Sequence, residues 1–179
     1  MKKLDLSIII IGKICSGKST LAKDFSRWVD YPIASFGSYL KDYSESNNLS
    51  IDRAALQNLG NSFIHQDPNQ FLLDVINHKN EKSTKLIFEG VRHQVILDGI
   101  RNLSSKSFAI FLDASEQVRL DRFLSREKDI DQSHAELDFQ ESSKHAVEQE
   151  VENLKNHCDF VLTANQGYHE FLKAVGLYS

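Results

Sequence analysis

Short apolar runs alternate with longer amphipathic segments along the chain. Five runs are rich in Ile, Val, Leu, Ala and Phe; they cover residues 6–11, 32–36, 85–88, 108–112 and 159–163. Runs of this length and composition are typical of strands buried on both faces of a parallel sheet. Because a parallel strand pair needs a crossover connection, the alternation predicts a doubly wound α/β sheet with helices on both faces.

The segments between the runs carry helix signals. Helical patterns cover residues 21–29, 51–59, 69–78, 116–126 and 142–157. Pro68 suits the first turn of the third helix, and the Ser115 side chain can cap the fourth. In the last helix Val147, Val151 and Leu154 share one apolar stripe, and Glu148 falls outside it, so we expect Glu148 away from the core.

Composition places the chain among single-domain globular proteins. It has 179 residues, of which 41% are hydrophobic and 26% charged, and no repeat or Pro/Gly/Ser linker divides it. Its net charge of −4 argues against a dedicated nucleic-acid binder. Two distant cysteines, Cys15 and Cys158, form no metal-binding or disulfide pattern, and residues 6–11 are too few for a membrane span. We therefore expect a cytoplasmic protein that binds neither membrane nor nucleic acid.

A phosphate-binding motif follows the first run and precedes the first helix. Residues 12–19, Gly-Lys-Ile-Cys-Ser-Gly-Lys-Ser, match G-x-x-x-x-G-K-[ST] at every fixed position. Glycines let successive backbone N–H groups turn toward an anion, and the helix adds its positive N-terminal end. Lys18 can then reach the β- and γ-phosphates, while the Ser19 hydroxyl can ligate Mg²⁺. The nucleotide-binding residues predicted from this motif are Gly12, Lys13, Cys15, Ser16, Gly17, Lys18, Ser19 and Thr20.

The order of several short motifs resembles a known enzyme group. They are the P-loop at 12–19, the segment 35–41 (Ser-Phe-Gly-Ser-Tyr-Leu-Lys), the turn 89–92 (Glu-Gly-Val-Arg), the helix 119–126 and the ending 158–167. Together they resemble the P-loop nucleoside monophosphate kinases, including deoxynucleoside monophosphate kinases and dephospho-coenzyme A kinase. The resemblance implies a three-layer α/β/α P-loop NTPase fold with a five-stranded parallel sheet. It also implies a short lid at about 127–140 and an acceptor-binding helical region at about 37–80, within one domain of residues 1–179.

The turn at 89–92 is the predicted metal and acceptor site. The resemblance implies that Glu89 helps to hold the Mg²⁺ water shell and that Arg92 grips the acceptor phosphate, for which a planar guanidinium is well suited. A rival match lies at Asp98 and Arg101. It leaves only five residues before the next strand, too few for a crossover helix, and the spacing therefore favours Glu89 and Arg92.

Three arginines follow the fourth run at helical spacing. Arg119, Arg122 and Arg126 stand at i, i+3 and i+7 and therefore share a helix face. The resemblance implies that Arg122 and Arg126 lie at the base of the lid and neutralise charge on the transferred phosphoryl group. We expect Arg119 to face solvent or to pair with Glu116.

The resemblance also implies where the two nucleotides lie. Phe36 and Gly37 would contact the acceptor, with Lys41 at the position of a common acceptor-phosphate arginine. Asn165 and Gly167 would lie in the loop that wraps the donor adenine. Lys41 departs from the family pattern because an ammonium lacks the bidentate fork of a guanidinium.

The sequence therefore predicts an ATP- and Mg²⁺-dependent kinase that acts on a small nucleotide acceptor, most simply a (deoxy)nucleoside monophosphate. Lys18, Arg92, Arg122 and Arg126 are its predicted catalytic residues, and we expect a monomer or a homodimer. One alternative is a hydroxyl-directed kinase that resembles dephospho-coenzyme A kinase. Another is a nucleotide-binding switch or NTPase that has no small-molecule acceptor, because a P-loop alone does not define the reaction.

Overall fold

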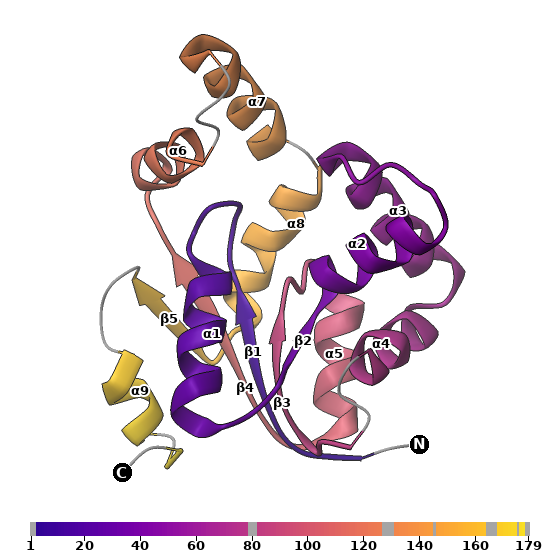
Figure 1. Ribbon diagram of the computed structural model, residues 1–179. Coiled ribbons are helices and arrows are strands. Elements are labelled where there is room, and N and C mark those ends of the chain that lie inside the picture. Colours follow the sequence, from indigo (N-terminus) through magenta and orange to yellow (C-terminus); the bar gives the residue numbers. More distant parts are fainter. Residues whose placement is uncertain are drawn as a thin grey trace.

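One parallel sheet of five strands organises the protein (Figure 1). The computed structural model describes residues 3–78, 82–126, 131–144, 146–163, 168–174 and 176–177. The strands are β1 (Leu4–Ile11), β2 (Ile33–Ser35), β3 (Lys85–Glu89), β4 (Ser104–Asp113) and β5 (Phe160–Thr163). They lie in the order β2-β3-β1-β4-β5, and every paired neighbour is parallel. The predicted five-stranded parallel sheet is confirmed.

Helices cover both faces of this sheet. Their bounds are α1 (Lys18–Val29), α2 (Phe36–Ser46), α3 (Arg53–Gln66), α4 (Pro68–Asn77), α5 (Gln94–Leu103), α6 (Glu116–Leu124), α7 (Gln132–Lys144), α8 (Ala146–Leu154) and α9 (Tyr168–Ala174), and residues Lys155–His157 form a 3₁₀ turn. Helices α1 and α9 pack in the core on one face, whereas α4, α5 and α8 pack in the core on the other (Figure 1). The three-layer α/β/α architecture is therefore as predicted.

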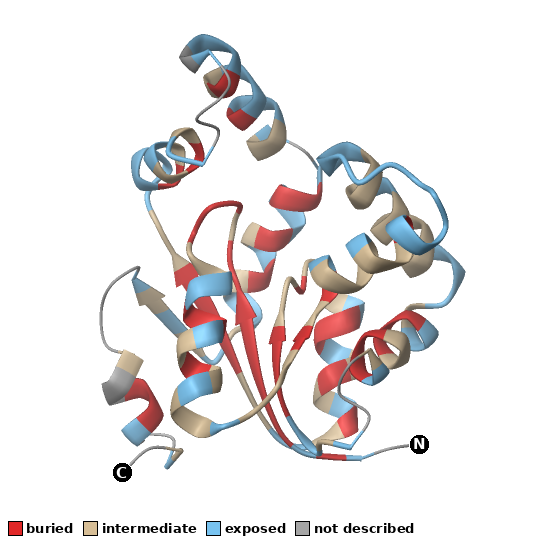
Figure 2. Ribbon diagram, in the orientation of Figure 1, coloured by how far each residue is buried: buried red, intermediate tan, exposed pale blue. Residues whose placement is uncertain are grey.

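Strand β1 is central because it contributes side chains to both cores. Ile9 and Ile11 lie in the core beneath α4, α5 and α8, while Ile8 and Ile10 lie in the core beneath α1 and α9. All four are fully buried, and Figure 2 shows the buried residues concentrated along the central strands. Because successive side chains of a strand point to opposite faces, a strand covered on both sides reads as one continuous apolar run.

Several helix boundaries differ from those predicted. Helix α3 begins at Arg53 because the Asp52 carboxylate caps it, accepting the Ala55 N–H at 2.9 Å. The single helix predicted over 142–157 is instead divided between α7 and α8. The predicted signals at Pro68 and Ser115 are confirmed, since Pro68 opens α4 and the Ser115 hydroxyl accepts the Val118 N–H of α6.

Helix α7 packs over the P-loop, in the region where the sequence predicts a lid. Ala135 and Phe139 of α7 form a small apolar cluster with Ile14, Cys15 and Phe123. Residues 127–130 of the predicted lid lie outside the described part of the chain. This part of the chain thus has an apolar cluster of its own, separate from the two cores on the sheet.

The expectation for Arg119 was wrong. Its side chain is only 5% exposed, and its guanidinium lies over the Phe139 ring at 5.5 Å from the ring centroid. Because α7 covers this face of α6, Arg119 contacts an aromatic ring instead of solvent. Its Nε and Nη1 atoms are buried without a hydrogen-bond partner in the described structure.

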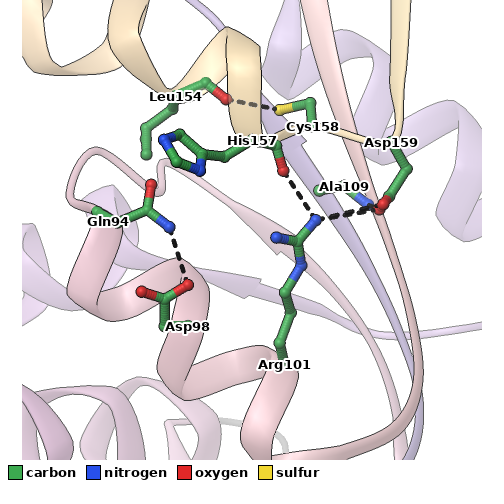
Figure 3. A network of polar contacts seen from close by, with 8 residues as sticks. All are labelled: Gln94, Asp98, Arg101, Ala109, Leu154, His157, Cys158 and Asp159. Carbon is green, nitrogen blue, oxygen red and sulfur yellow. Dashed lines mark hydrogen bonds and ion pairs between the residues drawn. The ribbon is translucent and has the colours of Figure 1, made fainter.

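The rival motif at Asp98 and Arg101 has a structural role (Figure 3). Arg101 donates to the His157 carbonyl at 2.8 Å and to both carboxylate oxygens of Asp159 at 3.3 Å. Asp159 in turn accepts the Ala109 N–H of β4 at 2.7 Å, and Asp98 accepts from Gln94 within the same helix. This network ties α5 to the connection that enters β5.

Among the described residues, no helix combines the length and hydrophobicity needed to cross a bilayer.

Candidate functional site

A cavity of about 320 Å³ lies beyond the carboxyl ends of β1 and β3. In an open parallel sheet this edge is the usual place for a ligand. The walls come from the P-loop, the connection from β3 to α5, and helices that include α2, α3, α4, α5, α6 and α8. Charged and polar lining residues include Lys18, Ser19, Arg53, Gln57, Asn61, Glu89, Arg92, His93 and Arg126, and apolar ones include Phe36, Leu40, Leu56, Phe71 and Phe123. The cavity therefore has a cationic part and an apolar part.

The P-loop adopts the curled backbone that its glycines allow. Gly17 has φ of 103°, in the left-handed region, and it caps the N-terminus of α1. A Cβ atom at Gly12 would lie 2.6 Å from the Leu112 carbonyl oxygen and 2.8 Å from the Ser16 hydroxyl. The turn therefore passes too close to β4 for a side chain at position 12. Helix α1 begins at Lys18, three residues earlier than predicted.

Lys18 extends back along the P-loop and lines the cavity. Its ammonium donates to the Lys13 carbonyl at 2.6 Å. Burial lowers its pKa to about 8, with help from the positive charge of Arg92, while Glu89 and Glu148 oppose the shift. A partly buried ammonium at the wall of a cavity is well suited to bind the phosphates of a nucleotide.

Glu89 lies at the end of β3 and accepts two hydroxyl hydrogen bonds. Ser19 donates to Glu89 Oε1 at 2.9 Å, and Ser35, at the end of β2, donates to Oε2 at 2.8 Å. The same Ser35 hydroxyl accepts the Ser38 N–H and so caps α2. One carboxylate beside the P-loop hydroxyl fits Mg²⁺, an ion that takes few protein oxygens and keeps waters and substrate phosphates as its other ligands.

Arg92 is held by a carboxylate that sequence reasoning did not connect with the site. Its Nη1 donates to Glu148 Oε1 at 2.8 Å, and Glu148 Oε2 accepts the Ile14 N–H of the P-loop at 2.9 Å. The expectation that Glu148 lies away from the core was wrong, because its side chain is only 1% exposed. Helix α8 packs against the P-loop on the side where Glu148 projects, and helical periodicity alone cannot reveal that contact.

Arg122 and Arg126, which the sequence predicts at the base of a lid, occupy different positions. Arg122 donates to the P-loop carbonyls of Ser16, at 2.7 Å, and Cys15, at 3.4 Å, and it is not among the described cavity-lining residues. Arg126 lines the cavity, with Nη1 at 3.8 Å from the Cys15 sulfur. In this arrangement Arg122 braces the P-loop, whereas Arg126 can contact a bound ligand.

The acceptor side of the cavity combines predicted and unexpected residues. Phe36 and Gly37 line it as predicted, and Phe36 packs edge-on against Phe71 with ring centroids 5.3 Å apart. Lys41 does not line it; the side chain is 56% exposed and pairs with Glu45 at 3.8 Å. The nearby cation at the cavity is instead Arg53, at the start of α3.

Helix α3 presents a polar face to the cavity that the sequence analysis missed. Arg53, Gln57 and Asn61 recur every four residues along it, and all three line the cavity. Desolvation lowers the pKa of Arg53, as do the positive charges of Arg92 and Arg126, although much of the side chain is exposed. The Gln57 amide nitrogen is buried and has no hydrogen-bond partner in the described structure. The spacing i, i+4, i+8 was the available signal, but it equally fits a solvent-facing stripe.

The other predicted nucleotide-binding residues lie on or after the P-loop. Lys13 pairs with Glu152 at 2.8 Å, Ser16 is 1% exposed, and Thr20 is exposed on α1. Asn165 and Gly167 fall outside the described residues.

Comparisons with known proteins agree with this geometry. The family model described as AAA domain (AAA_18) matches residues 8–148. A cytidylate kinase of Thermoplasma acidophilum is 30% identical over 142 residues, which cover 78% of this chain and 71% of that protein. A cytidylate kinase of Thermoplasma volcanium is 25% identical over 160 residues, or 86% of this chain and 73% of that protein. The crystal structure of shikimate kinase from Aquifex aeolicus shares the fold with a TM-score of 0.58 and 19% identity, covering 94% of this chain and 93% of its own.

The depressed pKa of Lys18 predicts a pH-dependent contribution to stability. The folded-state pKa of about 8 lies below the ordinary lysine value of 10.5, so between these pH values the unfolded chain holds a proton that the folded protein has lost. The Lys18 contribution to the free energy of unfolding should therefore rise across this window, by about 1–2 kcal/mol after allowance for partial exposure. Denaturant titration of the wild type and of Lys18→Met at pH 7.5 and pH 10 would measure the difference. An unchanged difference between the two proteins would contradict the shift.

Proposed function

This chain belongs to the AAA domain family and is a P-loop kinase of the nucleoside monophosphate kinase type; we propose that it transfers the γ-phosphoryl group of ATP, with Mg²⁺, to a nucleoside monophosphate. The observation that carries the proposal is the composition of the cavity described above. Lys18, Arg53, Arg92 and Arg126 line its cationic part, next to apolar walls that include Phe36 and Phe71. A nucleotide acceptor presents the same two chemistries, a doubly charged phosphate and a flat base.

On the donor side, the backbone turn of the P-loop and Lys18 bind the β- and γ-phosphates. Ser19 and Glu89 would hold Mg²⁺, which neutralises charge on the phosphate oxygens when it is bound. Arg122 donates to the Cys15 and Ser16 carbonyls and so keeps the turn in shape. These residues position the donor and neutralise its charge, and phosphoryl transfer requires little more from the protein.

On the acceptor side, Arg92 and Arg53 bind the monophosphate, and Phe36 packs against the base. An oxygen of that phosphate attacks the γ-phosphorus, the bond from the γ-phosphorus to the bridging oxygen breaks, and ADP leaves. Arg126 neutralises charge on the equatorial oxygens during transfer. Because the acceptor oxygen is already ionised, the reaction needs no general base. In agreement, Glu89 is the single carboxylate among the described lining residues, and two hydroxyls already bond to it.

A hydroxyl acceptor is the second candidate, and one feature favours it. His93 lines the cavity, and its Nδ1 lies 2.6 Å from Glu150 Oε2. A carboxylate bound at one ring nitrogen orients an imidazole so that the other can take a proton from an attacking hydroxyl. The phosphate acceptor is preferred because Arg53 and Arg92 both line the cavity, and an acceptor phosphate gives these two cations a ligand there.

The proposal is tested by incubating the protein with Mg·ATP and a panel of nucleoside and deoxynucleoside monophosphates, beginning with CMP, and the parent nucleosides. We expect ADP release that depends on a monophosphate and yields the matching diphosphate. Lys18→Ala should reduce turnover by a factor of about 10³ or more while the circular dichroism spectrum is unchanged. Acceptor-independent ADP release would instead indicate an NTPase, and phosphorylation of nucleosides would indicate a hydroxyl kinase. Undiminished turnover by Lys18→Ala would contradict the proposed donor site.

Arg53 should contribute mainly to acceptor binding. Removing a charged hydrogen-bond donor to phosphate should raise the acceptor KM in Arg53→Met by roughly 10- to 100-fold. The KM for ATP should change by less than about threefold, because the P-loop remains intact. Arg27→Met is the matched control, since Arg27 is 75% exposed on α1 and pairs only with Asp24 among its described contacts. Steady-state kinetics with each substrate varied would decide, and a rise confined to the ATP KM would refute this role for Arg53.

A further inference from the structure

Glu148 is a buried carboxylate that joins three parts of the site. It lies in the first turn of α8, and its neighbours Val147 and Val151 are also buried. Taking a carboxylate out of water is costly unless it is paired and hydrogen-bonded, so a carboxylate that is 1% exposed needs specific partners. The N-terminal end of α8 supplies a favourable dipole, and Arg92 supplies the opposite charge.

The two oxygens of Glu148 have different partners. Oε1 accepts from Arg92 Nη1 at 2.8 Å, and Oε2 accepts from the Ile14 N–H at 2.9 Å. One side chain thus links α8, which follows the lid helix α7 after a single intervening residue, to the P-loop and to the connection after β3. The Ile14 N–H is committed to this bond, so it is not one of the amides that bind phosphate.

The contact also determines how Arg92 meets a ligand. A guanidinium has five N–H donors in a plane, and Glu148 takes a donor on one edge. Arg92 lines the cavity and its side chain is 28% exposed, so the guanidinium retains donors for a ligand in the cavity. A side chain that is already oriented loses less conformational freedom when the ligand binds.

We propose that Glu148 is a positioning residue for phosphoryl transfer: it fixes one edge of the Arg92 guanidinium against the P-loop so that the other edge receives the acceptor phosphate. The inference rests on the proposed acceptor role of Arg92. It adds that one carboxylate of α8, Glu148, fixes the position of the acceptor-binding Arg92 relative to the P-loop, which binds the donor.

Glu148→Gln tests this role with little change in shape. Arg92 and the Ile14 N–H bond to different oxygens of Glu148, so in the glutamine variant an NH₂ donor faces one of these two donors, and the charge that holds the guanidinium is lost. The acceptor KM should rise roughly 10- to 100-fold, and the ATP KM should change by less than about threefold. A merely structural defect would raise both KM values together or lower kcat with every substrate. Glu141→Gln, the same substitution at an exposed position of α7, is the matched control and should behave like the wild type.

A double-mutant cycle with Arg92→Ala shows whether Glu148 acts through Arg92. If it does, adding Glu148→Gln to Arg92→Ala should change the acceptor KM by less than about twofold. The double variant should also melt at a higher temperature than Arg92→Ala, which leaves a buried carboxylate without its cation. Additive effects on the acceptor KM would overturn the proposal.

Two further outcomes separate this inference from the proposed function. A wild-type protein that shows no acceptor-dependent ADP release would refute the function itself, whereas an active wild type with an unchanged acceptor KM in Glu148→Gln would refute only the role of Glu148. Should Glu148→Gln fail to fold, Arg92→Lys retains a cation for Glu148 and loses the planar fork. That variant should also show a raised acceptor KM with a near-normal melting temperature, and an unchanged KM would overturn the proposal.

Discussion

Phosphate oxygens can be held inside a protein only where N–H groups and cations converge on them, and in this protein the turn between β1 and α1 provides that point. The turn needs glycine at position 12, because a side chain there would clash with the Leu112 carbonyl. It also needs a left-handed backbone at Gly17. Its position follows from β1, the strand that contributes to both cores. The remaining functional groups are arranged around this turn by the neighbouring strands and helices.

The cations at the site line the cavity, and the nearby carboxylates are bonded to protein groups. Lys18 and Arg126 lie toward the cavity, Glu89 is occupied by two serine hydroxyls, and Glu148 lies behind Arg92. The carboxylates thus limit repulsion among the cations without filling the cavity. Burial is the main cause of the lowered pKa of Lys18 and the charge of Arg92 the next, whereas Glu89 and Glu148 oppose the shift. Positive charge is in excess at the cavity wall, because its described lining includes Lys18, Arg53, Arg92 and Arg126 but one carboxylate, Glu89. Such an excess is what a site for two phosphate-bearing substrates requires.

Much of the architecture could be predicted from local patterns, because a doubly covered parallel sheet produces continuous apolar runs and the P-loop has fixed spacing. Residues whose environment depends on a distant element could not be placed this way. Arg119 is buried because α7 covers it, and Glu148 is buried because α8 packs against the P-loop. Arg53 lines the cavity, whereas Lys41 does not. Asp52 caps α3, so that Arg53 is the first residue of the helix. In each case the helical pattern shows which residues share a helix face, but it does not show which element of the fold packs against that face.

The central claim is that one cavity binds the donor and acceptor phosphates side by side. Titration calorimetry with a bisubstrate compound, adenosine joined through five phosphates to the nucleoside of the preferred acceptor, tests this claim directly in the presence of Mg²⁺. The account predicts one molecule bound per chain, with an affinity at least about 100-fold higher than that of ATP alone, because the two halves then bind together. An affinity equal to that of ATP would contradict the account, because it would mean that the acceptor half finds no site beside the donor.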